Sequence, residues 1–200
     1  MRIRIGLRVL VAAFFYTKAN CGVLELEKAI QYTPPMPVSP MRTPLDVGDD
    51  LLTLDAMGFE NLPFDRCSSV YFELGKVRFQ FKKGVGLQFL SASPADLKGE
   101  LESEWKDKVP NAPPAIIGKL DGFTAISLTA SRPANIKPSL FQVFWIQIET
   151  NMVLKVVAES CDDTTFKALT NSLQSLKIDK PKLLASLISD EPKIPAATSN

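Results

Sequence analysis

The longest β-strand signal in the chain is residues 140–160, LFQVFWIQIETNMVLKVVAES, and it constrains the fold more than any other segment. Apolar side chains alternate in mirror order on either side of residues 149–151. This pattern predicts a hairpin with a three-residue loop that pairs Ile146 with Leu154. The first strand, residues 140–148, is apolar on both faces, as is typical of a central strand in a sheet that is covered on both sides.

Two roles are open for the face of this strand that carries Phe141, Val143 and Trp145. If a helix covers that face, the three side chains are core residues. If the face lines a groove, they are the candidate binding residues, because large contiguous apolar patches rarely stay exposed without a use. The alternative that we favour is the core.

A helix is predicted to begin at Pro94 and to end before Pro110. Ser93 and Asp96 have the spacing of a capping box, and proline suits the first helical position. Its apolar stripe, at four-residue intervals, consists of Leu97, Leu101 and Trp105. The acidic and basic residues between them predict a solvated side with the ion pairs Glu102–Lys106 and Glu104–Lys108.

A second helix is predicted over Asp163–Lys177, with an apolar stripe of Phe166, Leu169, Leu173 and Leu176. The pair Asp162-Asp163 at its start has two interpretations, a helix cap or a carboxylate site for a metal or for acid–base chemistry. The cap is preferred, because the first turn of a helix offers unpaired N–H groups and a positive dipole end.

The remaining elements follow from shorter patterns. Residues 49–58 indicate a short helix that ends at Gly58, and the mirror alternation around Gly75-Lys76 predicts a tight hairpin. Further strands are expected at residues 87–91, 115–117 and 122–131.

These elements predict one α+β domain, a mainly antiparallel sheet with flanking helices, over residues 45–180. A signal peptide is expected at residues 1–20 and a proline-rich linker at residues 21–44. Residues 181–200 should form a tail with a short amphipathic helix.

The export interpretation depends on the arginines that precede the apolar run from Val9 to Tyr16, which is too short to span a bilayer. Lipidation of Cys21, an organelle presequence and an ordinary N-terminal helix remain alternatives. No acidic residue occurs before Glu25, so the rest of the chain is mildly acidic. That balance argues against a nucleic-acid-binding protein, which needs a clustered basic face.

Cys67 and Cys161 would be the two cysteines of an exported body. In an oxidising compartment they would form one disulfide, whereas the alternative is two buried thiols that pack as small apolar groups. The sequence leaves both open.

Catalytic chemistry has little support in the sequence. The chain contains no histidine, which removes the commonest general base and the commonest metal ligand. Ser103 and Lys106 have the Ser-x-x-Lys spacing, but they lie among alternating charges that indicate a solvated helix face. Nothing in the sequence indicates a metal or a cofactor.

Four segments together resemble the PsbP-like superfamily, which includes the photosystem-II extrinsic protein PsbP and DcrB-type envelope proteins of bacteria. The segments are PADLKGELESEWKDKV, GKLDGFTAISLTAS, LFQVFWIQIETNMVLKVVAES and TTFKALTNSLQSLKI, within residues 69–178. The resemblance lies in the order and patterning of elements. It implies a sheet flanked by helices and a binding or accessory role in an extracytoplasmic space, and it transfers no site residues.

The sequence therefore favours an exported, non-enzymatic binding or accessory protein of the cell envelope, periplasmic or secreted. Its partner would be an envelope protein or a small ligand, and it would contact a membrane only through a lipidated Cys21. The alternative is a hydrolase or transferase that uses carboxylates alone. Two carboxyl groups facing each other across a cleft would favour the enzyme, whereas aspartates confined to caps and turns would favour the binding protein.

Overall fold

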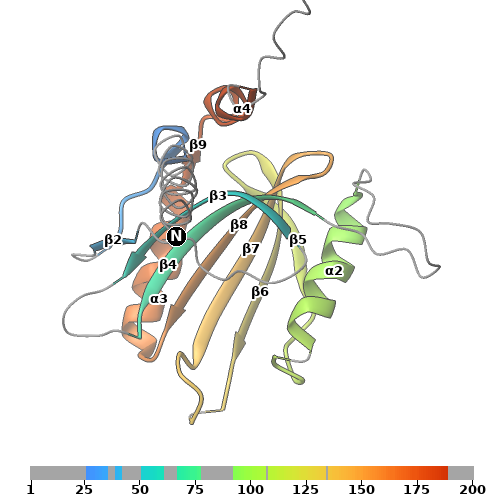
Figure 1. Ribbon diagram of the computed structural model, residues 1–200. Helices are drawn as coiled ribbons and strands as arrows, with labels where there is room; N and C mark the ends of the chain where they lie inside the picture. Colours follow the sequence, from blue (N-terminus) through green and yellow to red (C-terminus); the bar gives the residue numbers. More distant parts are fainter. Residues whose placement is uncertain are drawn as a thin grey trace, which may run out of the picture.

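A computed structural model shows a single α+β domain built on a strongly curved antiparallel sheet (Figure 1). It describes residues 26–35, 39–41, 51–60, 67–77, 92–106, 108–133 and 135–188. The strands are β1 Ile30–Gln31, β2 Ser39–Met41, β3 Leu51–Glu60, β4 Ser69–Val77, β5 Ile116–Leu120, β6 Phe123–Ser131, β7 Leu140–Glu149, β8 Met152–Ser160 and β9 Lys177–Ile178. The helices are α2 Pro94–Lys106, α3 Asp163–Ser172, the 3-10 turn η1 Leu173–Ser175 and α4 Lys180–Ile188. The expected signal peptide, Cys21 and the expected strand at 87–91 lie outside the described residues.

The main sheet has seven strands in the order β2-β3-β4-β8-β7-β6-β5, and every neighbouring pair is antiparallel. As predicted, β7 is a central strand and forms a hairpin with β8, in which Ile146 pairs with Leu154. The loop is shorter than predicted. Glu149 pairs with Met152, so Thr150 and Asn151 form a two-residue turn, and the register shifts at Ile148.

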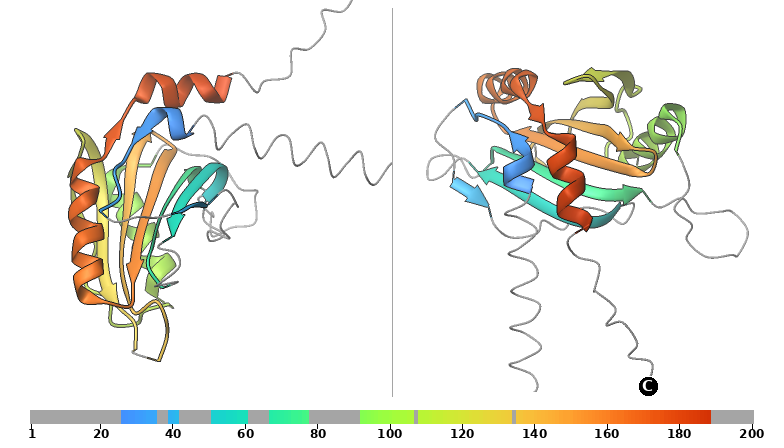
Figure 2. Two further views of the ribbon diagram at one scale, coloured as in Figure 1. Left: turned by 90° about the vertical axis from the view of Figure 1, so that its left-hand side faces the viewer. Right: turned by 90° about the horizontal axis from the view of Figure 1, so that it is seen from above.

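Helices cover both faces of the sheet, on opposite sides (Figure 2). One face packs against α3, η1 and α4 through Leu169, Leu173 and Leu183, each at most 2% exposed. The other face packs against the stripe of Leu97, Leu101 and Trp105 on α2. Two separate cores result, one on each side of the same strands.

Both predicted helix starts are confirmed by their capping bonds. The backbone N–H of Ser93 donates to the Asp96 carboxylate at 2.9 Å, and the Asp96 N–H donates to the Ser93 hydroxyl at 3.2 Å. At the second helix the Thr165 N–H donates to the Asp162 carboxylate at 2.7 Å. Each cap satisfies donors that the first turn of a helix leaves unpaired.

Two predictions about the first half of the domain are wrong. Residues 51–60 form the strand β3 rather than a short helix, because they pair along their length with β4. The chain does not turn at Gly75-Lys76 either. Gly75 lies within β4, between Thr53 of β3 and Val153 of β8, and two neighbouring strands hold it extended.

The range expected to be a linker contributes to the folded domain. Residues 26–29 form a helical turn whose Leu26 and Ala29 are buried, and Ile30 pairs with Ile178 in a second, two-stranded sheet. Pro40 lies in β2, which pairs with the end of β3. The domain therefore begins before residue 45, since the apolar residues from Leu26 onward join the core that α3 covers.

Candidate functional site

The candidate binding residues Phe141, Val143 and Trp145 lie beneath α2, and each is 0% exposed. Trp105 of the helix stacks on the Phe141 ring, with centroids 4.4 Å apart. Leu101 belongs to the same cluster. The arrangement is the covered face that we expected for this strand. A binding role for the three residues stays a prediction, and it would require α2 to move away.

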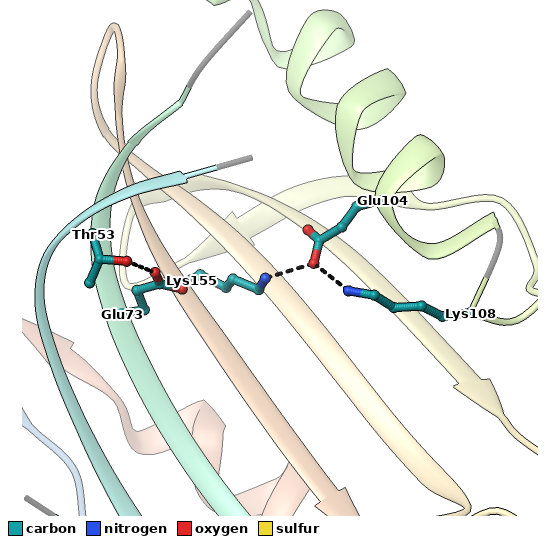
Figure 3. Close-up of polar contacts among 5 residues, drawn as sticks. All are labelled: Thr53, Glu73, Glu104, Lys108 and Lys155. Atoms are coloured by element: carbon teal, nitrogen blue, oxygen red, sulfur yellow. Dashed lines mark hydrogen bonds and ion pairs between the residues drawn. The ribbon is translucent and has the colours of Figure 1, made fainter. Parts of the chain in front are cut away.

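A group of buried charges occupies the same side of the sheet (Figure 3). Glu73 of β4 and Lys155 of β8 are cross-strand neighbours, 0% and 2% exposed. The Lys155 ammonium donates to the Glu104 carboxylate of α2 at 2.8 Å. Lys108 adds a more exposed ion pair to the same Glu104 oxygen at 3.2 Å. We call Glu73, Glu104 and Lys155 the charged cluster.

The charged cluster corrects the expectation that the polar residues of α2 all face solvent. Glu104 does pair with Lys108 as predicted, but its side chain is only 4% exposed and points inward to Lys155. Glu102 pairs with Lys98 instead of Lys106. A buried ammonium that has a carboxylate partner on a helix holds that helix over the strand, because breaking the pair would leave an uncompensated buried charge.

The pKa of the Glu73 carboxyl is raised to about 7, mainly by burial and to a smaller extent by the negative charge of the nearby Glu104. The hydrogen bond from the Thr53 hydroxyl and the charge of Lys155 act in the opposite direction. The second carboxylate oxygen of Glu73 has no hydrogen-bond partner among the described residues. The effect of burial on the pKa of Glu73 is larger than the opposing effects of Thr53 and Lys155, because an ionised oxygen without a hydrogen-bond donor is costly in a dry interior.

Two further groups beside the charged cluster have raised pKa values. Burial raises the pKa of the Tyr71 phenol, and Glu159, Glu104 and Glu73 raise it further by their negative charge. Burial also raises the pKa of Glu159, against the hydrogen bond from Ser69 and the charge of Arg132. Perturbed groups of this kind occur at functional sites and also in structural ion-pair networks.

A hollow of about 660 Å³ opens beyond the end of α2. One wall is the loop after α2, with Val109, Pro110, Asn111 and Pro113, and the opposite wall is the end of β6 with Arg132. Leu140 and Phe166 close it on the side of β7 and α3. We call it the Arg132 hollow. Its volume lies within the range of small-molecule sites, and its lining is largely apolar.

Arg132 is the charged residue of this hollow, and aromatic rings hold its side chain in place. Its guanidinium carbon lies 5.0 Å from the centre of the Phe141 ring and 5.6 Å from that of Trp105. One of its N–H groups donates to the carbonyl of Pro138 at 3.3 Å. A guanidinium has five N–H donors. The arrangement therefore presents a fixed cation at a largely apolar wall, with the Glu159 carboxyl close enough to interact with its charge.

A second hollow of about 400 Å³ lies on the other side of the loop 109–114, against Lys98, Glu102 and Lys106 of α2. Neither hollow includes a residue of the charged cluster in its lining. Glu73 has a pKa near that of a general acid or base, but it is 0% exposed and lines neither of the two hollows.

Cys67 and Cys161 form a disulfide, with their Cα atoms 5.6 Å apart. Of the two alternatives that the sequence leaves open, the structure has the bridge. Cys67 precedes β4 and Cys161 follows β8, and these strands are neighbours in the sheet. Beside the bridge, the hydroxyls of Ser68 and Ser160 lie 2.8 Å apart.

The other candidate groups have structural surroundings. Ser103 and Lys106 are both exposed on α2. Asp162 caps α3, and Asp179 accepts a hydrogen bond from the backbone of Lys182 in the first turn of α4. In the described ranges, no three cysteine or acidic side chains gather as metal ligands would. No helix of these ranges combines the length and apolar character that crossing a membrane requires.

Sequence reasoning missed both Arg132 and the charged cluster. The sequence contains one signal of the charged cluster, because Lys155 lies in the middle of the largely apolar strand β8, in which residues 152–158 are all buried. A charged residue in the middle of such a strand indicates a buried partner, although not which one. Arg132 follows a strand and precedes a proline, and that position alone does not distinguish it from an ordinary loop residue.

No protein-family model matches the chain, and no curated protein matches it significantly. Several solved structures are similar to it, among them the following two. The solution structure of cyanobacterial PsbP (CyanoP) from Synechocystis sp. PCC 6803 is 10% identical, with a TM-score of 0.45, over 76% of this chain and 88% of the other. The crystal structure of LpqN, involved in cell envelope biogenesis of Mycobacterium tuberculosis, is 20% identical, with a TM-score of 0.39, over 76% and 94%. Both TM-scores lie below 0.5, so these likenesses carry no argument about the fold family or the function of this chain, and the resemblance to the PsbP-like superfamily stays a prediction.

Proposed function

We propose that the protein is a non-enzymatic binding protein of an extracytoplasmic compartment, and that it takes an amphipathic anion in the Arg132 hollow. The observation that carries the proposal is the guanidinium of Arg132, held against Trp105 and Phe141 in an otherwise largely apolar space. An anion with an apolar body would match both parts of the lining. The charge would pair with Arg132, and the body would displace water from the proline, leucine and phenylalanine side chains.

The compartment is inferred from the disulfide and from the N-terminal sequence. Disulfides persist in oxidising compartments and are rare where cellular thiols keep cysteines reduced. The bond between Cys67 and Cys161 therefore fits an exported protein, as does the basic and apolar pattern of residues 1–20. The mature chain should begin near Asn20 or Gly22 without a lipid.

The carboxylate enzyme is the weaker alternative, because most of the described aspartates accept hydrogen bonds from backbone N–H groups. Asp96, Asp162 and Asp179 accept hydrogen bonds from backbone N–H groups at helix starts, and Asp121 accepts one from Ile178. The two glutamates that approach one lysine are buried outside both hollows. A hydrolytic site needs its two carboxyl groups on either side of a space for substrate.

Binding is tested by NMR titration of the isotope-labelled protein with octanoate, and with 1-octanol as the probe that lacks the charge. We expect saturable shifts for octanoate at the amides of Val109, Asn111 and Ala112, at those of residues 129–132, and at Phe166. Arg132→Gln should weaken octanoate binding at least about tenfold, since a charge-assisted hydrogen bond contributes about 1.5–3 kcal/mol. Lys137→Gln is the matched control, because Lys137 is an exposed cation in the same loop between β6 and β7.

Equal binding of octanoate and 1-octanol, or shifts that do not saturate, would contradict the anion site. A thermal melt of Arg132→Gln verifies that the variant is folded. The compartment is tested separately, by alkylating the protein as it is recovered from its cells and determining its intact mass. Two free thiols at Cys67 and Cys161, or a retained Met1, would contradict export.

A further inference from the structure

The two edges of the seven-stranded sheet differ in how they are protected. β2 forms one edge, is three residues long and contains Pro40, which lacks a backbone donor. A short strand with a proline is a usual way to prevent further pairing. β5 forms the other edge, and its five residues from Ile116 to Leu120 pair with β6 in unbroken register. No proline and no bulge interrupts β5.

The outer side of β5 is open and apolar. Ile116 is 68% exposed and Ile117 is 47% exposed, and they are two of the three large apolar side chains that stand out from the described surface. They point to opposite faces of the sheet, because successive side chains of a strand alternate. Within the part of the chain that the structure describes, β6 is the strand with which β5 pairs. An open apolar edge is a template for one more strand.

We propose that β5 pairs antiparallel with β5 of a second copy of this chain, about a twofold axis at Gly118, and continues the sheet across a homodimer. The register that uses all five residues sets Gly118 against Gly118, Ile116 against Leu120 and Ile117 against Lys119. Pro114 and the turn at Asp121-Gly122 bound the ladder, since proline cannot donate and the turn residues have φ angles of 48° and 83°.

A second copy suits this edge because the strand is self-complementary in that register. Its single charge, Lys119, would lie opposite an isoleucine and not opposite another lysine, and like charges directly opposite each other are destabilising. The aliphatic part of the lysine can cover Ile117 while the ammonium stays in water. A ladder of five residues buries little area, so we expect a weak dimer of the kind formed by interfaces below about 1,200 Å².

Gly118 provides a test that leaves the monomer intact. A Cβ atom added there would meet nothing within 4 Å, and the same is true of Gly99 on the exposed side of α2. Gly118→Glu places two like charges directly opposite each other in the dimer alone, whereas Gly99→Glu adds the same charge on α2, outside the β5 ladder. Gly118→Lys provides the opposite charge for a mixing experiment.

Sedimentation velocity of the full chain, from about 10 μM to about 500 μM, measures the association in the range expected for a weak interface. We expect concentration-dependent dimers of the wild type and of Gly99→Glu. The dissociation constant of Gly118→Glu should be at least about threefold higher, and mixing Gly118→Glu with Gly118→Lys should restore dimers. A wild type that stays monomeric would overturn the proposal, as would a dimer that Gly118→Glu does not weaken. A monomeric wild type would mean that β5 is free to pair with a strand of another protein. A dimer that Gly118→Glu does not weaken would mean that the dimer interface lies outside β5.

Discussion

Replacing Glu73 with glutamine should stabilise the protein at pH 8, although Glu73 lies in the middle of the fold. Burial raises the pKa of this carboxyl from its ordinary value of 4.5 to about 7. The folded state therefore holds a proton that the unfolded chain has already lost between these two pH values, and the free energy of unfolding decreases as pH rises through this window. Above pH 7 the folded protein carries the full cost of a buried, ionised Glu73.

That cost is about 3 kcal/mol, since each pKa unit corresponds to about 1.4 kcal/mol. Glutamine has nearly the same shape as the protonated acid and can still accept the hydrogen bond from Thr53. Lys155 keeps its partner Glu104 at 2.8 Å. The Glu73→Gln variant should thus match the wild type near pH 5 and exceed its stability by up to about 3 kcal/mol at pH 8.

Urea denaturation of both proteins at pH 5, 6, 7 and 8 measures this difference, and Glu149→Gln is the matched control. Glu149 is a partly exposed glutamate in a surface ion pair with Lys180, and such pairs contribute at most about 1 kcal/mol. A Glu73→Gln variant that is less stable by the same amount at every pH would refute the reasoning. It would mean that Lys155 and Thr53 stabilise the ionised form by more than burial penalises it.

Three further predictions concern packing, cross-linking and capping. Trp145→Ala should lower the free energy of unfolding, measured by denaturation, by about 3–5 kcal/mol, as large-to-small core changes do. A melting temperature within about 2 °C of the wild type would contradict the place of Trp145 beneath α2. Replacing Cys67 and Cys161 by serine should lower the free energy of unfolding by about 4–5 kcal/mol in the chain-entropy model, because the bridge joins residues 94 apart in sequence. Unchanged stability would contradict the bridge. Asp162→Ala should cost about 1 kcal/mol by loss of the cap bond, whereas Asp163→Ala should cost less, and equal losses would contradict that assignment.

The elements that could be predicted from the sequence are those whose information is local. The capping box of Ser93 and Asp96 and the Asp162 cap specify where helices begin, within a few residues of chain. The β7–β8 hairpin shows itself through side chains that alternate about its turn. In each case the residues that decide the structure are close neighbours in sequence.

The elements that could not be predicted depend on partners that are distant in the chain. Residues 51–60 have no local feature that separates a strand from a helix, and pairing with β4 decides between them. The turn expected at Gly75-Lys76 had good local chemistry, yet β4 continues because β3 and β8 flank it. Asp121-Gly122 is a true hairpin turn with the Asp-Gly sequence that favours type I′ geometry, and the strand pattern alone did not reveal it.

The candidate site was beyond prediction for the same reason, since its parts come from elements that are far apart in the chain. Lys155 of β8 and Glu104 of α2 are 51 residues apart in sequence, and their pairing becomes visible only when the helix lies over the sheet. Arg132 acquires its surroundings from Trp105 on α2 and from Phe141 on β7. Composition and spacing report none of these contacts.

The two sides of the sheet differ in composition. The side that α3 covers has a core of buried apolar side chains. The side that α2 covers combines aromatic residues with a buried ion pair, although a hydrophobic replacement of similar size is often as stable as such a pair.

The ion pair between Glu104 and Lys155 fixes the position of α2 along the strands, because Glu104 has to reach Lys155. Trp105, the next residue of the helix, then stacks on Phe141 and holds the guanidinium of Arg132 at the hollow. The charged cluster thus determines the geometry of the proposed binding site without lining it.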